Sequence, residues 1–285
     1  MQTLQLKRML EAFLEEDLGH GDITSQPIAS GKRGKGQWIA KEEGVFAGKD
    51  VIDMLPLLNV SQDVTIRMHI NEGDVIEQGT ILGEIEGPLL YLLETERVIL
   101  NLVQRMSGIA TLTNRAARLL NGSVTRVCDT RKTTPGLRML EKHAVVCGGG
   151  VNQRFGLYDG ALIKDNHIAL AGSVTKAIEL VRGAAGHLTP IQVEVETYSE
   201  FQEALKASNQ LQSILFDNVS PETLTDWLQE VPNHLVTEAS GAVNIEDLPA
   251  YRPTGVHFVS LGKLTHSAKS LDISFNLQGG RKYGT

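Results

Sequence analysis

The chain has 285 residues and a net charge of −7, and its 41% apolar and 21% charged residues are typical of a globular protein with a sizeable core. No apolar run approaches the about 18 residues that a membrane helix needs, and the N-terminus lacks the basic and apolar pattern of a secretion signal. The two cysteines, Cys128 and Cys147, have no CxxC spacing, which argues against a disulfide framework or a metal cluster and favours a reducing, cytoplasmic compartment.

The first part of the chain predicts one helix followed by short strands. Residues 3–18 carry an apolar stripe with helical spacing, and Gly19 follows as a stop signal. Between 36 and 87 the pattern changes to short alternating runs bounded by turn residues. These runs predict strands at 37–40, 64–68 and 80–85, with a helix near 48–58 between them.

The rest of the chain alternates strands and helices. A long helix is predicted at 88–120, and shorter helices near 138–146, 174–182, 199–207 and 221–229 follow it. The short apolar strands are expected at Val124–Cys128, Ala161–Ile163, Ile191–Val195, Ile214–Phe216, Leu235–Thr237 and Val256–Val259. This βα rhythm predicts a parallel sheet or barrel with its helices outside.

Polar residues follow each predicted strand. They are Asp129–Lys132, Lys164–His167, Glu194 with Glu196, Asp217 with Asn218, Glu238–Gly241 and Ser260–Gly262. The carboxyl ends of barrel strands meet at one rim, where active sites are assembled from several strands. Six polar clusters in register therefore predict a functional site at that rim.

The charge of the chain is unevenly distributed. The segment Arg126–Lys164 holds seven Lys/Arg and three Asp/Glu, a local charge of +4 in an acidic chain. A basic centre in an acidic protein indicates a focused pocket for an anion rather than a nucleic-acid surface. The candidate cations are Arg131, Lys132, Arg138, Arg154 and Lys164, and salt bridges to Asp129, Asp159 and Asp165 are the structural alternative.

Acidic and glycine residues add further candidates at the rim. Glu194 and Asp217 end successive strands, where carboxylates can hold Mg²⁺, bind ribose hydroxyls or only neutralise the cations. Ser240-Gly241 and Gly262 precede predicted helix starts, a position that suits phosphate binding.

Nine segments together resemble the quinolinate phosphoribosyltransferase family, and the resemblance covers nearly the whole chain. They are Glu15–Ser25, Asn101–Thr111, Asp129–Arg138, Cys147–Gly150, Leu162–His167, Val193–Glu196, Leu215–Asn218, Glu238–Gly241 and Leu261–Ser267. The resemblance implies a type II phosphoribosyltransferase fold of the α/β class, with an N-terminal α/β sandwich and an incomplete α/β barrel. The sandwich would span 1–110 and take back a last strand near Leu271–Phe275, within 270–285, while the barrel would span 111–269.

The resemblance also implies the reaction. A glycosyltransferase of the pentosyltransferase type would join quinolinate to phosphoribosyl pyrophosphate with Mg²⁺, releasing pyrophosphate and carbon dioxide. The product, nicotinate mononucleotide, would serve de novo NAD synthesis. The expected assembly is a cytoplasmic homodimer with shared active sites, or such dimers stacked into a hexamer. The expected partners are these small molecules, without nucleic acid or membrane.

The resemblance assigns roles residue by residue. Arg131, Arg154 and Lys132 would hold the quinolinate carboxylates, with Arg105 arriving from the neighbouring subunit. Lys132 and Lys164 would face the phosphoribosyl pyrophosphate, while Glu194 and Asp217 would hold the ribose and the metal, so these four are the expected catalytic residues. The other expected substrate-binding residues are Thr130, Gln153, Ser240, Gly241, Ala242, Ser260, Leu261, Gly262 and His266.

One position departs from the family pattern, because Asn152-Gln153-Arg154 stands where the family usually has Asn-His-Arg. Gln153 can donate a hydrogen bond, but it cannot add positive charge as a histidine can. We therefore expect Gln153→His to leave activity unchanged or to improve it.

Three alternative functions are consistent with parts of the sequence. A homologue linked to molybdenum transport operons would act on a different acceptor, but Arg105, Arg131 and Arg154 together suit a dicarboxylate. A barrel lyase would use Lys132 or Lys164 as a Schiff base. A carrier module would rest on the hairpin-like turn Gly73–Gly79, which we interpret as scaffold because Gly87-Pro88 leads directly into an apolar helix without the exposed carrier lysine.

Overall fold

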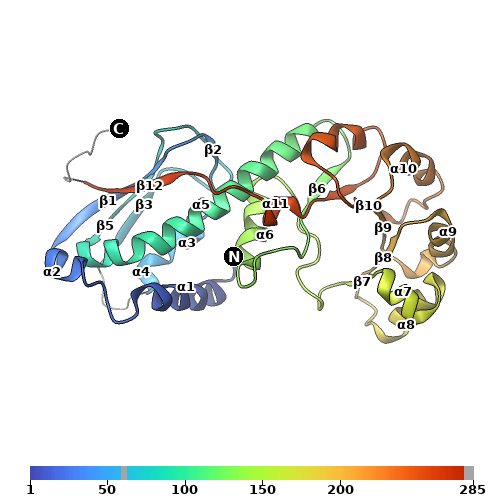
Figure 1. Cartoon of the computed structure of the whole chain (residues 1–285), viewed down its shortest axis with the longest axis horizontal. Coiled ribbons are helices and arrows are strands. Elements are labelled where there is room, and N and C mark those ends of the chain that lie inside the picture. The colour runs from blue at the N-terminus through green and yellow to red at the C-terminus, as the bar shows by residue number, and fades with distance from the viewer. Residues whose placement is uncertain (59–62, 279–285) are drawn as a thin grey trace. The chain divides into compact units, whose positions relative to one another are not determined.

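The computed structural model describes residues 1–58 and 63–278, which divide into two units, each with its own sheet (Figure 1). Unit 1 takes its described residues from 1–112, 139–149 and 268–285, and unit 2 consists of 113–138 and 150–267. The sequence analysis placed the domain boundary between residues 110 and 111 and so assigned 139–149 to the barrel, whereas in the structure this segment belongs to unit 1. None of the helices in the described part of the chain has the length and apolar character to span a membrane.

Unit 1 begins with the predicted amphipathic helix. α1 (Thr3–Leu18) buries Leu6, Leu10 and Leu14 on one face, and Gly19 follows it with φ 49°, which favours glycine and ends the helix. The other elements of unit 1 are α2 (Ser25–Ala29), β1 (Arg33–Ala40), β2 (Gly44–Val45), α3 (Lys49–Asp53), α4 (Leu55–Leu58), β3 (Thr65–Met68), β4 (Val75–Ile76), β5 (Ile81–Pro88), the first part of α5 (Leu89–Leu119), most of α6 (Arg138–Cys147) and β12 (Ile273–Leu277).

The main sheet of unit 1 has the strand order β12-β1-β5-β3 with antiparallel pairing. On β1, Trp38 lies opposite Phe275 of β12, and the two ring centroids are 5.4 Å apart. The Phe275 ring covers Gly36, because an added Cβ there would lie 2.1 Å from Cζ of Phe275. The last strand therefore completes the first sheet. The amide of Gln104 on α5 donates to the carbonyl of Ile273 over 2.7 Å, which ties the long helix to that strand.

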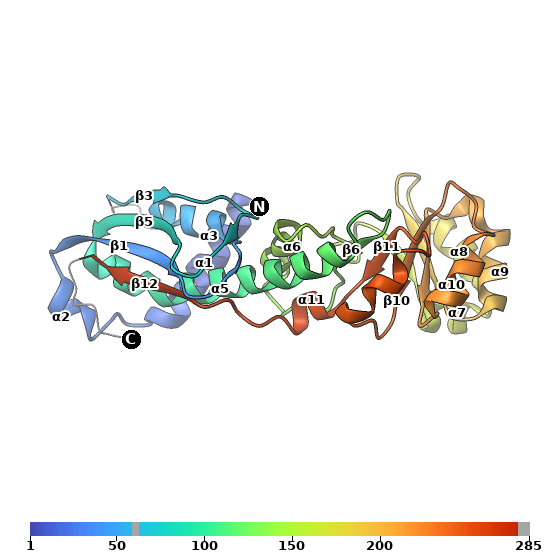
Figure 2. The same cartoon turned by 90° about the horizontal axis from the view of Figure 1, so that it is seen from above.

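Unit 2 contains the predicted βα repeats. Its elements are the end of α5, β6 (Arg126–Cys128), β7 (Ala161–Ile163), α7 (Asp165–Ala171), α8 (Val174–Ala184), β8 (Ile191–Val195), α9 (Tyr198–Lys206), η1 (Ser208–Gln210), β9 (Ser213–Asp217), α10 (Pro221–Leu228), β10 (Val236–Ser240), η2 (Ile245–Tyr251), β11 (Phe258–Ser260) and α11 (Lys263–His266). Figure 2 shows α7 to α10 gathered outside the strands. Phe201 of α9 stacks on Trp227 of α10 at 5.4 Å and meets Phe216 of β9 edge-on, which fixes these helices against the sheet.

The sheet of unit 2 is an open barrel. Its order is β6-β11-β10-β9-β8-β7 and its pairs are parallel, with β6 and β7 as the two end strands. Over the described residues no ladder joins β6 to β7, so the predicted incomplete α/β barrel is confirmed. Val151 adds one parallel bridge to Cys128 at the free edge of β6.

Most predicted elements agree with the structure, but two strands lie further along the chain than predicted. β10 runs over Val236–Ser240 rather than 235–237, and β11 over Phe258–Ser260 rather than 256–259. The sequence analysis ended the strand that corresponds to β10 before the charged residue Glu238, whereas the backbone ladder between β10 and β9 continues to Ser240. α7 begins in the polar cluster that follows β7, and the sequence analysis did not predict it as a helix.

Candidate active site

A cavity of about 590 Å³ lies at the carboxyl ends of the barrel strands in unit 2. Its lining residues are Thr130, Arg131, Lys132, Gln153, Arg154, Leu162, Lys164, Glu194, Leu215, Asp217, Asn218, Ser240, Gly241, Ala242 and Ser260. Most of the residues expected from the sequence are therefore brought together at one rim. Leu162 and Leu215 line the cavity without having been expected as site residues, whereas Asn218 was expected at the rim and also lines it.

The loop that follows β6 presents two of the cations. The hydroxyl of Thr130 accepts the backbone N–H of Lys132 over 3.0 Å, and the hydroxyl of Thr265 donates to the Lys132 carbonyl over 2.8 Å. Arg138 braces the same loop, because its Nε donates to Thr133 Oγ1 over 2.9 Å and its Nη2 to the Arg131 carbonyl over 3.4 Å. Arg138 therefore supports the loop and is absent from the residues that line the cavity.

The parallel bridge between Val151 and Cys128 brings residues 151–154 to the same rim. Val151 donates its N–H to Val127 over 3.0 Å, and its carbonyl accepts the N–H of Asp129 over 3.1 Å. The buried carboxylate of Asp129 then accepts the N–H of Gln153 over 2.9 Å. These backbone bonds place Gln153 and Arg154 against the loop that carries Arg131.

Arg131 and Arg154 hold positive charge in a partly buried place. In the described part of the chain, their Nε atoms are buried and have no hydrogen-bond partner. Burial, and then the charge of Arg131, lower the pKa of Arg154, while Asp159 opposes this shift. Two repelling guanidinium groups with unused donors favour an anion between them, and the planar guanidinium suits a carboxylate or a phosphate.

The same cavity also carries acidic groups at the ends of β8 and β9. Lys164 Nζ forms an ion pair with the buried carboxylate of Glu194, and Asp217 accepts a hydrogen bond from the Asn218 amide over 3.0 Å. The pKa of the neighbouring Glu196 is raised, first by burial and then by Asp217 and other carboxylates. Negative charge therefore concentrates at the ends of β8 and β9, where a cation would be stabilised.

The loop after β10 approaches the loop after β9 closely. Gly241 has φ 125°, and an added Cβ would lie 2.5 Å from Oδ1 of Asn218, so only glycine fits there. Asn218 itself has a positive φ of 57°. Both loops line the cavity, through Asp217 and Asn218 on one side of this close approach and through Ser240, Gly241 and Ala242 on the other.

Four expected site residues do not line this cavity: Arg105, Leu261, Gly262 and His266. The N–H of Leu261 donates to the Cys128 carbonyl over 2.9 Å, so this donor is used within the sheet. Gly262 adjoins Lys132 and His266, because an added Cβ would lie 2.8 Å and 3.3 Å from their side chains. Arg105 lies on α5 in unit 1, where its Nη2 pairs with buried Glu141 at 2.9 Å and its Nη1 donates to the Ala268 carbonyl.

A second cavity of about 340 Å³ lies within the barrel, and Gln153 and Arg154 line both cavities. Its wall includes Glu238, which is 4% exposed and accepts hydrogen bonds from the amides of Gln153 and Gln192, each over 2.8 Å. Burial raises the pKa of Glu238. The sequence analysis placed Glu238 among the polar residues that follow this strand, because the predicted strand ended one residue before it. The structure instead places Glu238 within β10, and it was not among the expected substrate-binding residues.

Two family models match the chain. The quinolinate phosphoribosyl transferase N-terminal domain matches residues 22–107, and the C-terminal domain of the same family matches residues 109–276. A probable carboxylating nicotinate-nucleotide pyrophosphorylase of Bacillus subtilis (strain 168) is 49% identical over 97% of this chain and 95% of its own length. The corresponding protein of Synechocystis is 39% identical over 94% of this chain and 91% of its own. The solved nicotinate-nucleotide pyrophosphorylase of Francisella tularensis is 32% identical, with a TM-score of 0.91 over 98% of each chain.

Proposed function

The chain belongs to the quinolinate phosphoribosyltransferase family, and we propose that it performs the reaction of that family. It is a carboxylating nicotinate-nucleotide pyrophosphorylase, an enzyme of the pentosyltransferase class. It transfers the phosphoribosyl group of phosphoribosyl pyrophosphate to quinolinate, with decarboxylation. The products are nicotinate mononucleotide, pyrophosphate and carbon dioxide, and the nucleotide serves NAD biosynthesis.

The observation that supports this reaction best is the pair Arg131 and Arg154. Each has a buried Nε without a partner among the described residues, and the charge of one disfavours the charge of the other. An anionic ligand with two adjacent carboxylates would satisfy both donors and relieve the repulsion. Quinolinate carries two neighbouring carboxylates on a flat ring, so it suits this pair better than an acceptor with a single carboxylate.

The second substrate would occupy the other half of the cavity. Lys132 and Lys164 would neutralise the pyrophosphate, since a lysine side chain is a mobile point charge. The backbone at Ser240, Gly241 and Ala242, with Ser260 beside it, would receive the ribose phosphate. Glu194 and Asp217 would then bind the ribose hydroxyls. In this proposal the ribose would lie between the arginine pair and the lysines.

Glu194 and Asp217 also fit Mg²⁺, because Mg²⁺ is usually held by one or two carboxylates together with substrate phosphates. When bound, the ion would neutralise charge on the departing pyrophosphate. Lys164 already pairs with Glu194, so Asp217 carries the carboxylate that is not neutralised by that lysine.

The protein needs little acid–base chemistry for this reaction. Ribosylation makes the ring nitrogen cationic, and the ring then draws electrons from the adjacent carboxylate, so decarboxylation is driven largely by the substrate. The side chains contribute position and charge: the arginines orient the acid, and the lysines stabilise the leaving group. No covalent lysine intermediate is required, and in the structure Lys164 forms an ion pair with Glu194.

The proposal includes a cytoplasmic homodimer in which Arg105 enters the partner's active site. The Arg105 side chain is 23% exposed and contacts Glu141 and the carbonyl of Ala268. When two subunits bind, Arg105 would either keep these contacts or exchange them for contacts with the partner. Mixing inactive Arg105→Ala and Arg131→Ala chains tests this arrangement, because a shared site would restore part of the activity in hybrid dimers. A monomer by analytical ultracentrifugation, with no restoration, would remove this part of the proposal.

The experiment that tests the function is a carbon dioxide release assay with carboxyl-labelled quinolinate, phosphoribosyl pyrophosphate and Mg²⁺. We expect carbon dioxide and pyrophosphate in equal amounts, and neither when any one component is omitted. Nicotinate and other pyridine acids assayed in parallel identify the acceptor. Faster pyrophosphate release with a pyridine monocarboxylate than with quinolinate would support the alternative acceptor and contradict the proposal.

A further inference from the structure

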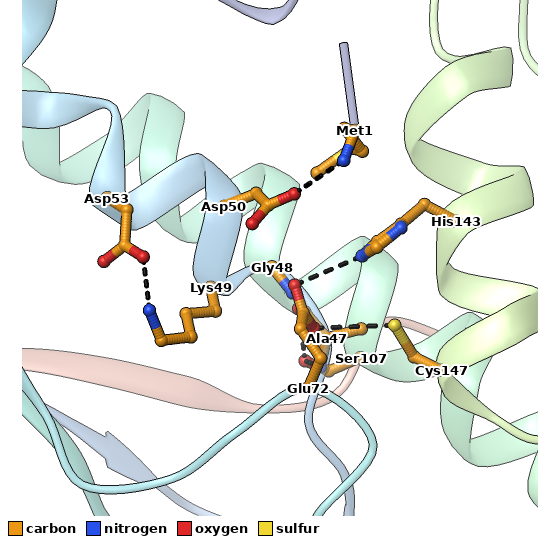
Figure 3. A network of polar contacts seen from close by, with 10 residues as sticks. All are labelled: Met1, Ala47, Gly48, Lys49, Asp50, Asp53, Glu72, Ser107, His143 and Cys147. Carbon is orange, nitrogen blue, oxygen red and sulfur yellow. Dashed lines mark hydrogen bonds and ion pairs between the residues drawn. The ribbon is translucent and has the colours of Figure 1, made fainter. Parts of the chain in front are cut away.

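Three side chains with metal-binding atoms meet within unit 1 (Figure 3). Glu72 lies in the turn between β3 and β4, while His143 and Cys147 lie on α6. The spacing of four residues along a helix puts His143 and Cys147 on the same face, one turn apart. One ligand atom from each of the three residues lies within 4.8 Å of the others.

The distances between these side chains suit a shared metal ion. Glu72 Oε1 is 3.3 Å from His143 Nε2, and Glu72 Oε2 is 3.5 Å from Cys147 Sγ. Typical bond lengths around tetrahedral zinc place such an oxygen about 3.4 Å from a nitrogen ligand and about 3.6 Å from a sulfur ligand. The observed separations are close to these values, although each involves a different oxygen of the Glu72 carboxylate, so a single ion can replace the two hydrogen bonds that join these groups.

The carboxylate is already oriented by the protein. The N–H of Gly48 donates to Glu72 Oε2 over 3.0 Å and approaches Oε1 at 3.2 Å, and the next residue of the turn, Gly73, donates its N–H to the Phe46 carbonyl over 2.9 Å. A hydrogen bond to a ligating carboxylate fixes its direction and typically strengthens metal binding. Access is also available, because the side chains of His143 and Glu72 are 25% and 22% exposed.

We propose that Glu72, His143 and Cys147 bind a divalent transition-metal ion of the zinc type, with solvent completing a four-coordinate shell. A thiol, an imidazole and one carboxylate form a donor set that zinc and cobalt accept, whereas Mg²⁺ and Ca²⁺ prefer all-oxygen sites. The bound ion links the β3–β4 turn to α6 and so stabilises unit 1. This site is independent of the Mg²⁺ proposed for the reaction, which uses unit 2 residues.

Cobalt provides the decisive measurement, since Co²⁺ bound to a thiolate gives a near-ultraviolet charge-transfer band. We expect the full-length, chelator-treated protein to bind a single equivalent of Co²⁺ with that band, and Zn²⁺ to displace it. Zn²⁺ should also raise Tm by about 3 °C or more, because a ligand that binds only the folded chain stabilises it. Wild-type protein without the thiolate band contradicts the proposal.

Variants assign the ligands. Cys147→Ser removes the band, and Glu72→Gln and His143→Gln each weaken Co²⁺ binding tenfold or more. Cys128→Ala, which changes the other cysteine, and His187→Gln, which changes an exposed histidine, leave binding intact and serve as controls. A band that survives Cys147→Ser, or binding unaffected by both other ligand variants, overturns the site. Circular dichroism checks folding, and the wild-type titration decides the matter for any variant that fails to fold.

Discussion

The amide Nε2 of Gln153 donates to the carboxylate Oε1 of Glu238 over 2.8 Å inside the barrel of unit 2. Gln153 also lines the cavity at the rim, so the buried carboxylate determines how this side chain faces the proposed substrate. Gln192 holds the other carboxylate oxygen, Oε2, over 2.8 Å. Glu238 is therefore a positioning residue for the rim rather than a group that touches the reacting atoms.

The first prediction concerns Glu238→Gln. This change keeps the shape but replaces a charged acceptor by a neutral one, which weakens a hydrogen bond by about 1 kcal/mol. We expect KM for quinolinate to rise roughly fivefold, with KM for phosphoribosyl pyrophosphate little changed. Steady-state kinetics with each substrate varied separately measures both values. Gln192→Met, which leaves the Gln153 bond in place, is the control and should have the smaller effect; an equal rise in both KM values would contradict a positioning role.

The same residue predicts a pH-dependent stability. Burial raises the pKa of the Glu238 carboxyl above its ordinary value of 4.5. A raised folded-state pKa stabilises the fold fully below the unfolded pKa, and this contribution is lost as pH rises through the folded pKa. Glu238→Gln has no carboxyl to ionise, so its Tm relative to that of the unchanged protein should increase from about pH 4 to about pH 8. A relative Tm that falls over this range would show that the ionised carboxylate is favoured by the fold.

Arg131→Ala tests the arginine pair. Loss of a partly buried carboxylate partner costs about 2–5 kcal/mol, so kcat/KM for quinolinate should fall between roughly thirtyfold and several thousandfold. Arg126→Ala is a matched control, because Arg126 is an exposed residue at the start of β6, the strand that leads to Arg131. Retained kcat/KM for quinolinate in Arg131→Ala would contradict the role of the arginine pair in binding the dicarboxylate.

Gln153→His tests the departure from the family pattern. An imidazole facing the Glu238 carboxylate would gain a charge partner, which raises its pKa and adds positive charge near the substrate. We expect turnover of quinolinate to stay unchanged or to improve, with a greater benefit toward lower pH where the imidazole is charged. A large loss in kcat/KM at every pH would show that Gln153 is adapted to a different acceptor.

Asp217→Asn tests the proposed Mg²⁺ site. The change removes the carboxylate that no lysine neutralises, so KM for phosphoribosyl pyrophosphate and the Mg²⁺ concentration for half-maximal rate should both rise tenfold or more (about 1.4 kcal/mol or more). Chelation of Mg²⁺ should abolish turnover of the unchanged enzyme. Glu222→Gln, an exposed acid on α10, is the control. An unchanged Mg²⁺ dependence in Asp217→Asn would place the ion elsewhere.

Much of the fold could be predicted because its signals are local. The stripe of Leu6, Leu10 and Leu14 predicted α1, and the apolar runs at 161–163 and 191–195 predicted β7 and β8 with the bounds that the structure has. Glu238 marks the limit of this reasoning: a charged residue ended the predicted strand, although the strand continues and turns that side chain inward. Whether a charge ends a strand or lies buried within it depends on neighbouring strands, which local patterns do not contain.

Local patterns were enough to predict the order of the strands and helices and the chemical types at the strand ends, because periodicity and chain order are properties of neighbouring residues. Which of those residues share a cavity depends on the folded structure. Arg131 and Arg154 repel each other because the Val151 bridge brings them together, and Arg138 supports the loop instead of lining the cavity. The fold also brings Glu72 beside His143 and Cys147, which follow it in the chain by 71 and 75 positions. Sheet pairing and packing across the whole chain determine which residues that are distant in sequence come together. These contacts in turn set the burial of each side chain and the charges around it.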